Sequence, residues 1–100
     1  MKITELESAD QLAELQKGFV LLDFYATWCQ PCKMMATVLE TYASDIPVVK
    51  IDIEKFQDIA IQHNVRGVPN LVLTNDDTTV ATKTGYLKDS ELQVFLDTNT

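Results

Sequence analysis

Two cysteines separated by two residues are the side chains best suited to chemistry. Cys29 and Cys32 lie in the run WCQPC at residues 28–32. Such a pair could be part of a zinc site, a structural disulfide or a redox-active dithiol. A structural zinc site needs about four ligands, and beyond this pair the chain offers no cysteine and a single histidine, His63. A disulfide that closes so short a loop removes little entropy from the unfolded chain, so we favour the redox dithiol and expect no metal.

The position of the pair predicts different roles for the two thiols. The pattern places Cys29 where a buried strand ends and a helix begins. There it faces unpaired backbone N–H groups and the positive end of the helix dipole, which favour a nucleophilic thiolate. Cys32 lies about one turn deeper and can reach the same sulfur, so we expect it to be the resolving cysteine. Pro31 is tolerated in the first turn, where its missing N–H would have no intrahelical acceptor, and it stiffens the short ring.

Asp23 interrupts an otherwise apolar strand, between Leu22 and Phe24. Burial would make its carboxyl costly to ionise and would raise its pKa. Such an acid can take or give a proton for Cys32 through a water molecule. The alternative is that Asp23 is merely exposed at an edge of the sheet.

The strands that must position these residues are marked by apolar and β-branched runs. We expect strands at residues 19–26 and 48–53, and a hairpin of residues 71–73 and 79–84 around the turn at 75–77. Helices come between them, which gives a βαβ half followed by a ββα half. This order predicts an α/β protein with a central mixed β-sheet flanked by helices on both faces.

The helices are marked by caps and by apolar stripes. A first helix is expected after Ser8, which forms a capping-box pattern with Gln11. The longest should run from about Cys29 to about Ser44, with a core-facing stripe; its members are Met34, Met35, Val38, Leu39 and Tyr42. A short helix should run along residues 56–63 with His63 at its end, and a last one should be capped by Asp89 or Ser90.

Length and charge exclude several classes of function. The chain has 100 residues, which suits one domain spanning residues 1–100. Its net charge of −7 and the lack of a basic cluster argue against nucleic-acid binding, and they favour a soluble monomer. The N-terminal residues do not resemble a signal peptide and no apolar run could span a bilayer, so we expect a cytoplasmic protein without membrane contact.

Three segments of the sequence together resemble the thioredoxin family. They are the run DFYATWCQPCKM at residues 23–34, the run RGVP at residues 66–69 and the run KTG at residues 83–85. The resemblance covers essentially the whole chain and implies the thioredoxin fold. It also implies a thiol–disulfide oxidoreductase that reduces protein disulfides through a reversible Cys29–Cys32 cycle.

The resemblance assigns further site residues. Val68 and Pro69 are similar to the family's cis-proline loop, where the backbone of Val68 would pair with an extended substrate segment. Gly85 resembles the glycine that leaves room for substrate, and Lys50 resembles the family's partner for the buried acid Asp23. The remaining residues of the expected substrate-facing surface are Trp28, Gln30 and Pro31.

The family also implies the source of electrons. A flavin-dependent thioredoxin reductase, supplied by NADPH, would restore the dithiol. The chain has no dinucleotide-binding fingerprint of its own, so we expect no bound cofactor. Two alternatives are an oxidant or isomerase, which would use the same dithiol in another redox direction, and a binding module that uses the fold as a scaffold.

The chain departs from the family pattern at several positions. Gln30 replaces the usual glycine between the cysteines, where residues tune the redox potential. Asn70 follows Pro69 in place of the more usual threonine, which bears on substrate preference. Thr37 stands in place of a helix-kinking proline, so we expect a less kinked helix. The other two departures are Asp77 in the hairpin turn and Tyr86 after Gly85.

Overall fold

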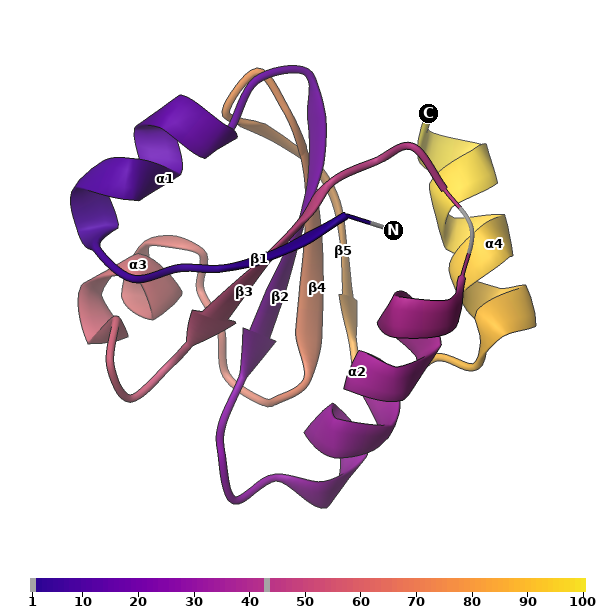
Figure 1. Ribbon diagram of the computed structural model, residues 1–100, viewed down its shortest axis with the longest axis horizontal. Helices are drawn as coiled ribbons and strands as arrows, with labels where there is room; N and C mark the ends of the chain where they lie inside the picture. The colour runs from indigo at the N-terminus through magenta and orange to yellow at the C-terminus, as the bar shows by residue number, and fades with distance from the viewer. Residues whose placement is uncertain (1, 43) are drawn as a thin grey trace.

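The computed structural model describes residues 2–42 and 44–100 of the chain. Five strands and four helices alternate along it (Figure 1). In chain order they are β1 (Ile3–Glu5), α1 (Ala9–Leu15), β2 (Phe19–Tyr25), α2 (Gln30–Thr41), β3 (Val48–Asp52), α3 (Gln57–Gln62), β4 (Asn70–Asn75), β5 (Thr78–Thr84) and α4 (Asp89–Asn99).

The strands form one mixed sheet in the order β1-β3-β2-β4-β5. β1 and β2 run parallel to β3 on its two sides, whereas β4 is antiparallel to both β2 and β5. The expected central mixed sheet is therefore confirmed. The strand that leads to the cysteines, β2, lies in the middle of the sheet.

Helices cover both faces of this sheet, as expected, with α1 and α3 on one side and α2 and α4 on the other (Figure 1). The side chains of β2 alternate between the two layers. Val20, Leu22 and Phe24 belong to a core that includes residues of α1 and α3. Leu21 belongs to a second core with Met35 of α2 and residues of α4. By the same alternation, Asp23 lies on the face that α2 and α4 cover.

Several helix ends differ from expectation. The Ser8 side chain makes no capping hydrogen bond, and the Gln11 side chain accepts instead from the Glu7 N–H. The last helix begins at Asp89, after Lys88 as N-cap, so neither Asp89 nor Ser90 caps it. The long helix ends at Thr41, before Ser44. Caps depend on backbone angles at single residues, and several polar residues compete for each one.

The hairpin turn is tight and uses two residues with positive φ. Asp76 and Asp77 have φ of 47° and 73°, as in a type I′ turn, whose backbone twist matches that of the flanking strands. The side chain and backbone of Asp76 also hold the turn to the start of β2. The Gly18 N–H donates to Asp76 Oδ1 at 2.8 Å, and the Asp76 N–H donates to the Gly18 carbonyl at 3.0 Å.

The short edge strand β1 was not predicted. It has three residues, too few for an alternating pattern to be visible in the sequence.

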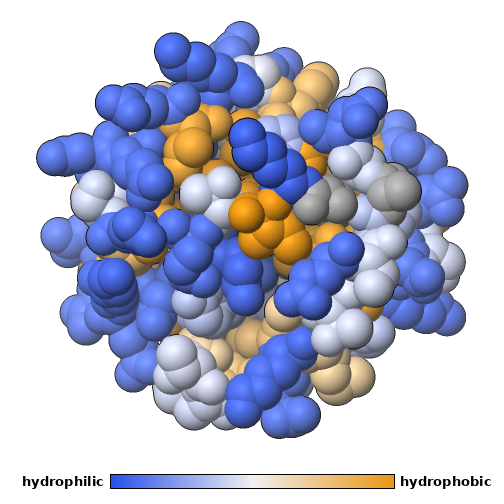
Figure 2. Space-filling model, in the orientation of Figure 1, coloured by the Kyte–Doolittle hydropathy of each residue, from blue (hydrophilic) through white to orange (hydrophobic). Residues whose placement is uncertain are grey.

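Hydrophilic side chains dominate the surface seen in the orientation of Figure 1, and apolar ones gather toward its middle (Figure 2). No helix among the described residues is long and apolar enough to cross a membrane.

Candidate active site

The two cysteines lie at the junction between β2 and α2 and are joined in a disulfide. β2 ends at Tyr25, and Cys29 is the N-cap of α2, with an extended backbone conformation. The Cα atoms of Cys29 and Cys32 are 5.2 Å apart. Pro31 lies in the first turn of α2, where its missing N–H leaves no intrahelical bond unmade. The expected position at a strand-to-helix junction is confirmed.

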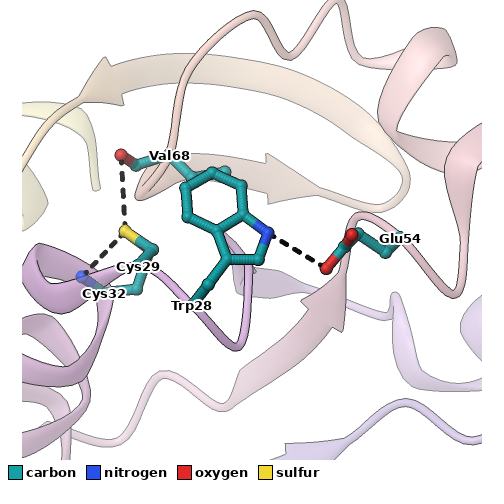
Figure 3. The surroundings of a disulfide bond; sticks show 5 residues. All are labelled: Trp28, Cys29, Cys32, Glu54 and Val68. Carbon is teal, nitrogen blue, oxygen red and sulfur yellow. Dashed lines mark hydrogen bonds between the residues drawn. A yellow bond between two sulfur atoms is a disulfide. The ribbon is translucent and has the colours of Figure 1, made fainter.

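The Cys29 sulfur lies in a polar environment made by the backbone. Its Sγ accepts a hydrogen bond from the Cys32 N–H at 3.2 Å, and the Val68 carbonyl oxygen lies 3.8 Å away (Figure 3). The N–H donor and the aligned peptides of α2 favour negative charge on this sulfur. Both cysteines are almost fully buried, at 5% exposure for Cys29 and 4% for Cys32.

The loop before β4 lies against the dithiol. The Val68–Pro69 peptide is cis, and Val68 packs against the cluster formed by Ala26 and the two cysteines. The Gly85 N–H donates to the Pro69 carbonyl at 2.7 Å. This contact brings the segment after β5 to the same end of the sheet.

Three large apolar side chains that are close in sequence to Cys29, Cys32 or Gly85 are exposed. Trp28 is 67% exposed, and its Nε1 donates to Glu54 Oε1 at 3.1 Å (Figure 3). Met34 and Tyr86 are also exposed. The prediction that Met34 fills the core is wrong, whereas Met35 is fully buried. Glu54 was missed by the sequence analysis, because nothing local to the end of β3 shows that Trp28 reaches it.

Asp23 is buried, with 1% of its surface exposed. It lies in the central strand β2, where it pairs with Lys50 of β3 on one side and Leu71 of β4 on the other. Burial raises its pKa from 3.8 to about 7, against a lowering by the charge of Lys50 and with a further raising by Glu5. Neither carboxyl oxygen has a hydrogen-bond partner among the described residues. The alternative of an exposed edge position is wrong.

Lys50 lies against Tyr25 and makes no hydrogen bond to Asp23 in the described part of the chain. Its Nζ is 4.6 Å from the centre of the Tyr25 ring, which is a favourable distance for a cation–π contact. The Tyr25 hydroxyl in turn donates to Glu5 Oε2 at 2.6 Å. Sequence analysis missed both Tyr25 and Glu5. The only signal in the sequence was the alternation of side chains along the strand, which places Tyr25 on the same face as Asp23.

His63 lies elsewhere, at the C-terminal end of α3, as expected. Its ring centre is 5.4 Å from that of Phe24. Burial lowers its pKa, and the charge of Asp77 opposes this effect. No group of three or more His, Cys, Asp or Glu side chains within residues 2–42 and 44–100 is arranged to hold a metal ion.

The comparisons with known proteins agree with this geometry. The family model described as thioredoxin matches residues 2–98. A thioredoxin of Pseudomonas aeruginosa is 45% identical over 86 residues, which cover 82% of this chain and 80% of that one. A thioredoxin of Buchnera aphidicola is 40% identical over 104 residues, covering 98% and 96% of the two chains. Among solved structures, a mutant thioredoxin from Halobacterium salinarum is similar with a TM-score of 0.90 and 34% identity, covering 99% of this chain and 91% of that one.

Proposed function

This chain belongs to the thioredoxin family, and we propose that its dithiol reduces client proteins with Cys29 as nucleophile and Cys32 as resolving residue. The chain is a thiol–disulfide oxidoreductase of the disulfide-reductase type. The observation that carries the assignment of roles is the position of Cys29. Its Sγ accepts from the Cys32 N–H at the start of α2, which favours the thiolate on this sulfur once the disulfide is reduced.

The proposed cycle moves two electrons and two protons to the client. The Cys29 thiolate attacks one sulfur of a client disulfide, forms a mixed disulfide and releases the other client sulfur as a thiolate, which takes up a proton. The Asp23 carboxylate then accepts the Cys32 proton through water, and Cys32 attacks Cys29 Sγ. The second client thiolate leaves and is protonated, and the Cys29–Cys32 disulfide remains.

Asp23 suits this role because its pKa of about 7 lies near the pH at which the protein would work. A group with such a pKa exists in both protonation states, so it can accept a proton and return it later in the cycle. Lys50 is the proposed partner, since its charge favours the ionised carboxyl. No described residue donates a hydrogen bond to the Asp23 oxygens, and such a bond would favour the ionised carboxyl and lower its pKa.

A client segment would bind along the surface around the disulfide. We propose that it runs beside Val68 and Pro69 in an extended conformation, since backbone pairing gives affinity with little dependence on side chains. Gly85 would leave space for it, and the exposed Trp28 would border it. Gln30 and Pro31 complete the proposed surface, as the exposed residues between the two cysteines.

Replacing Gly85 by alanine should impair client reduction more than it impairs folding. Gly85 has φ of +100°, and a Cβ built there meets no atom within 4 Å. The added methyl would therefore project into open space at the proposed docking surface. We expect kcat/KM for a protein disulfide to fall about tenfold, as for a moderate steric conflict, together with a loss of about 1–3 kcal/mol in unfolding free energy from backbone strain.

Gly18→Ala is the matched control, because Gly18 also has a positive φ, +66°, and open space at the Cβ position. It lies next to the hairpin turn, just before β2. It should lose stability to a similar degree and keep its kcat/KM. Equal kcat/KM values for the two variants at a temperature where both are folded would contradict the role of Gly85.

We propose a separate flavin-dependent reductase, supplied with NADPH, as the electron donor. The chain itself would hold no cofactor. We further propose that the protein is cytoplasmic and monomeric, which agrees with its net charge of −7 because like charges oppose self-association.

The proposed direction of electron flow is tested by a coupled assay. Insulin, NADPH and a bacterial thioredoxin reductase are mixed with the oxidised protein, and NADPH absorbance is followed. We expect steady NADPH consumption that depends on the protein. If NADPH is not consumed while the oxidised protein transfers its disulfide to a reduced client, the protein is an oxidant and the proposed direction is wrong.

A further inference from the structure

We propose that Glu5 and Tyr25 form a positioning pair that sets the protonation equilibrium of Asp23 by holding a negative charge and Lys50 at fixed places beside it. This inference rests on the proposed role of Asp23 and adds a regulation of that role. Glu5 is the last residue of β1 and Tyr25 the last residue of β2. The hydrogen-bond contacts of the Cys29 sulfur are with the Cys32 N–H and the Val68 carbonyl, and not with Glu5 or Tyr25. Glu5 and Tyr25 would therefore act on the dithiol through Asp23 and Lys50.

The register of the sheet places three charged residues, Glu5, Lys50 and Asp23, in one row across neighbouring strands. Glu5 pairs with Lys50, and Lys50 pairs with Asp23 on its other side. Directly paired residues on neighbouring strands point to the same face, which here is the face that α2 covers. Lys50 therefore stands between two carboxyl groups, one exposed on β1 and one buried on β2.

Tyr25 connects the members of the row. Its hydroxyl donates to Glu5 Oε2 at 2.6 Å, and its ring lies 4.6 Å from Lys50 Nζ. The first contact links the exposed Glu5 carboxylate to the end of β2. The second gives the ammonium group a partner other than Asp23, whose oxygens have no hydrogen-bond partner among the described residues.

Each charge in this row shifts the pKa of Asp23 in the direction that its sign predicts. The Glu5 charge raises the pKa of Asp23, and the Lys50 charge lowers it. Burial raises the pKa of Tyr25, and so do its hydrogen bond to Glu5 and the charges of Glu5, Asp52 and Asp23. Tyr25 therefore remains a neutral donor at working pH. On its other side Asp23 pairs with the uncharged Leu71 of β4, and the charges that act on its pKa come from β3 and β1 rather than from α2 or α4.

The test is the Asp23 pKa, measured in the oxidised protein by NMR of the side-chain carboxyl carbon during a pH titration. Glu5→Gln removes a like charge and should lower this pKa by about half a pH unit, the size of a cross-strand charge interaction. Near pH 7 that corresponds to about a threefold change in the ratio of ionised to protonated Asp23. The pH midpoint for Cys32 attack on a mixed disulfide should move in the same direction.

Two further variants separate this role from a general effect of charge. Glu7→Gln makes the same charge change just beyond β1, at an exposed residue that is not among the charges acting on Asp23, and should leave the pKa unchanged. Tyr25→Phe keeps a ring for Lys50 but releases Glu5, so it should lower the pKa by a smaller amount. The double variant Glu5→Gln/Tyr25→Phe should shift it no further than Glu5→Gln alone.

Equal shifts in Glu5→Gln and Glu7→Gln, or no shift in Glu5→Gln, would overturn the proposal. The underlying role of Asp23 is checked separately with Asp23→Asn. If that variant keeps the pH profile of Cys32 attack, then Asp23 is not the proton acceptor, whatever the Glu5 variants show for its pKa.

Discussion

Replacing Cys29 by serine should reduce the rate of protein-disulfide reduction by about 10³-fold or more, since removal of a covalent nucleophile is among the largest single-residue effects in enzymes. A serine hydroxyl at this position cannot form the mixed disulfide. The measurement is the NADPH-coupled reduction of insulin at pH 7. The fold should survive, because serine is close to cysteine in size, and circular dichroism checks this.

Cys32→Ser should behave differently and so tests the assignment of the two roles. Cys29 remains in this variant and can still attack, but nothing resolves the mixed disulfide. We expect the client to stay covalently attached through one of its sulfurs, which mass spectrometry under non-reducing conditions detects as a mass increase equal to the client. A Cys29→Ser variant that traps clients equally well would reverse the roles of the two cysteines.

The double variant Cys29→Ser/Cys32→Ser examines the scaffold alternative. A binding module would keep its biological activity without either sulfur, whereas a disulfide reductase would lose it completely. Full activity of the double variant in a partner-dependent assay would therefore contradict a redox role as the main function.

Asp23→Asn should raise the free energy of unfolding at high pH and should also slow the resolution of the mixed disulfide. The Asp23 pKa of about 7, in place of the ordinary 3.8, means that the folded protein holds this proton more tightly than the unfolded chain does. Ionisation of Asp23 therefore costs folding free energy. The penalty is absent below about pH 4, grows as pH rises from about 4 to 7, and is constant above the folded-state pKa.

Asparagine cannot ionise and so removes this pH dependence. The difference in unfolding free energy between Asp23→Asn and the unchanged protein should grow by on the order of 4 kcal/mol between about pH 4 and pH 8. Any constant cost of burying the amide cancels in that comparison. Urea unfolding of the two oxidised proteins at a series of pH values provides the measurement.

Activity should change in the opposite direction from stability. Without the carboxylate, Cys32 must lose its proton to solvent, and we expect resolution of the mixed disulfide at pH 7 to slow by about 10²-fold, a common contribution of a general base. Glu7→Gln is a suitable control because Glu7 is an exposed acid whose replacement should alter neither property. A stability difference that stays flat across pH would show that Asp23 ionises normally in the folded protein.

Much of the fold could be predicted because the information is local. The long apolar run at residues 19–26 and the β-branched run at 48–53 are visible within a few residues, and the structure places β2 and β3 there. The two cysteines and Pro31 lie within four consecutive positions of the chain, so their arrangement at a helix start follows from the same short segment. The hairpin turn at Asp76 and Asp77 could be predicted for the same reason, because the two turn residues are adjacent in the sequence.

Other features depend on segments that are distant in the sequence. β1 is a strand only because it pairs with β3, since three residues carry no period of their own. The exposure of Met34 beside the buried Met35 depends on how α2 packs against the sheet. Trp28 and Glu54 meet only because β3 ends beside the loop that follows β2.

Local sequence was enough to establish the dithiol, its place before a helix and most of the order of strands and helices, because each is encoded in a few adjacent residues. The electrostatics around the dithiol required the folded chain. Whether Asp23 is exposed or buried depends on β3, β4 and the covering helices, and its pKa depends on charges at Lys50 and Glu5 from two other strands. Desolvation and charge act through space, so they take effect when the chain folds and brings these strands together.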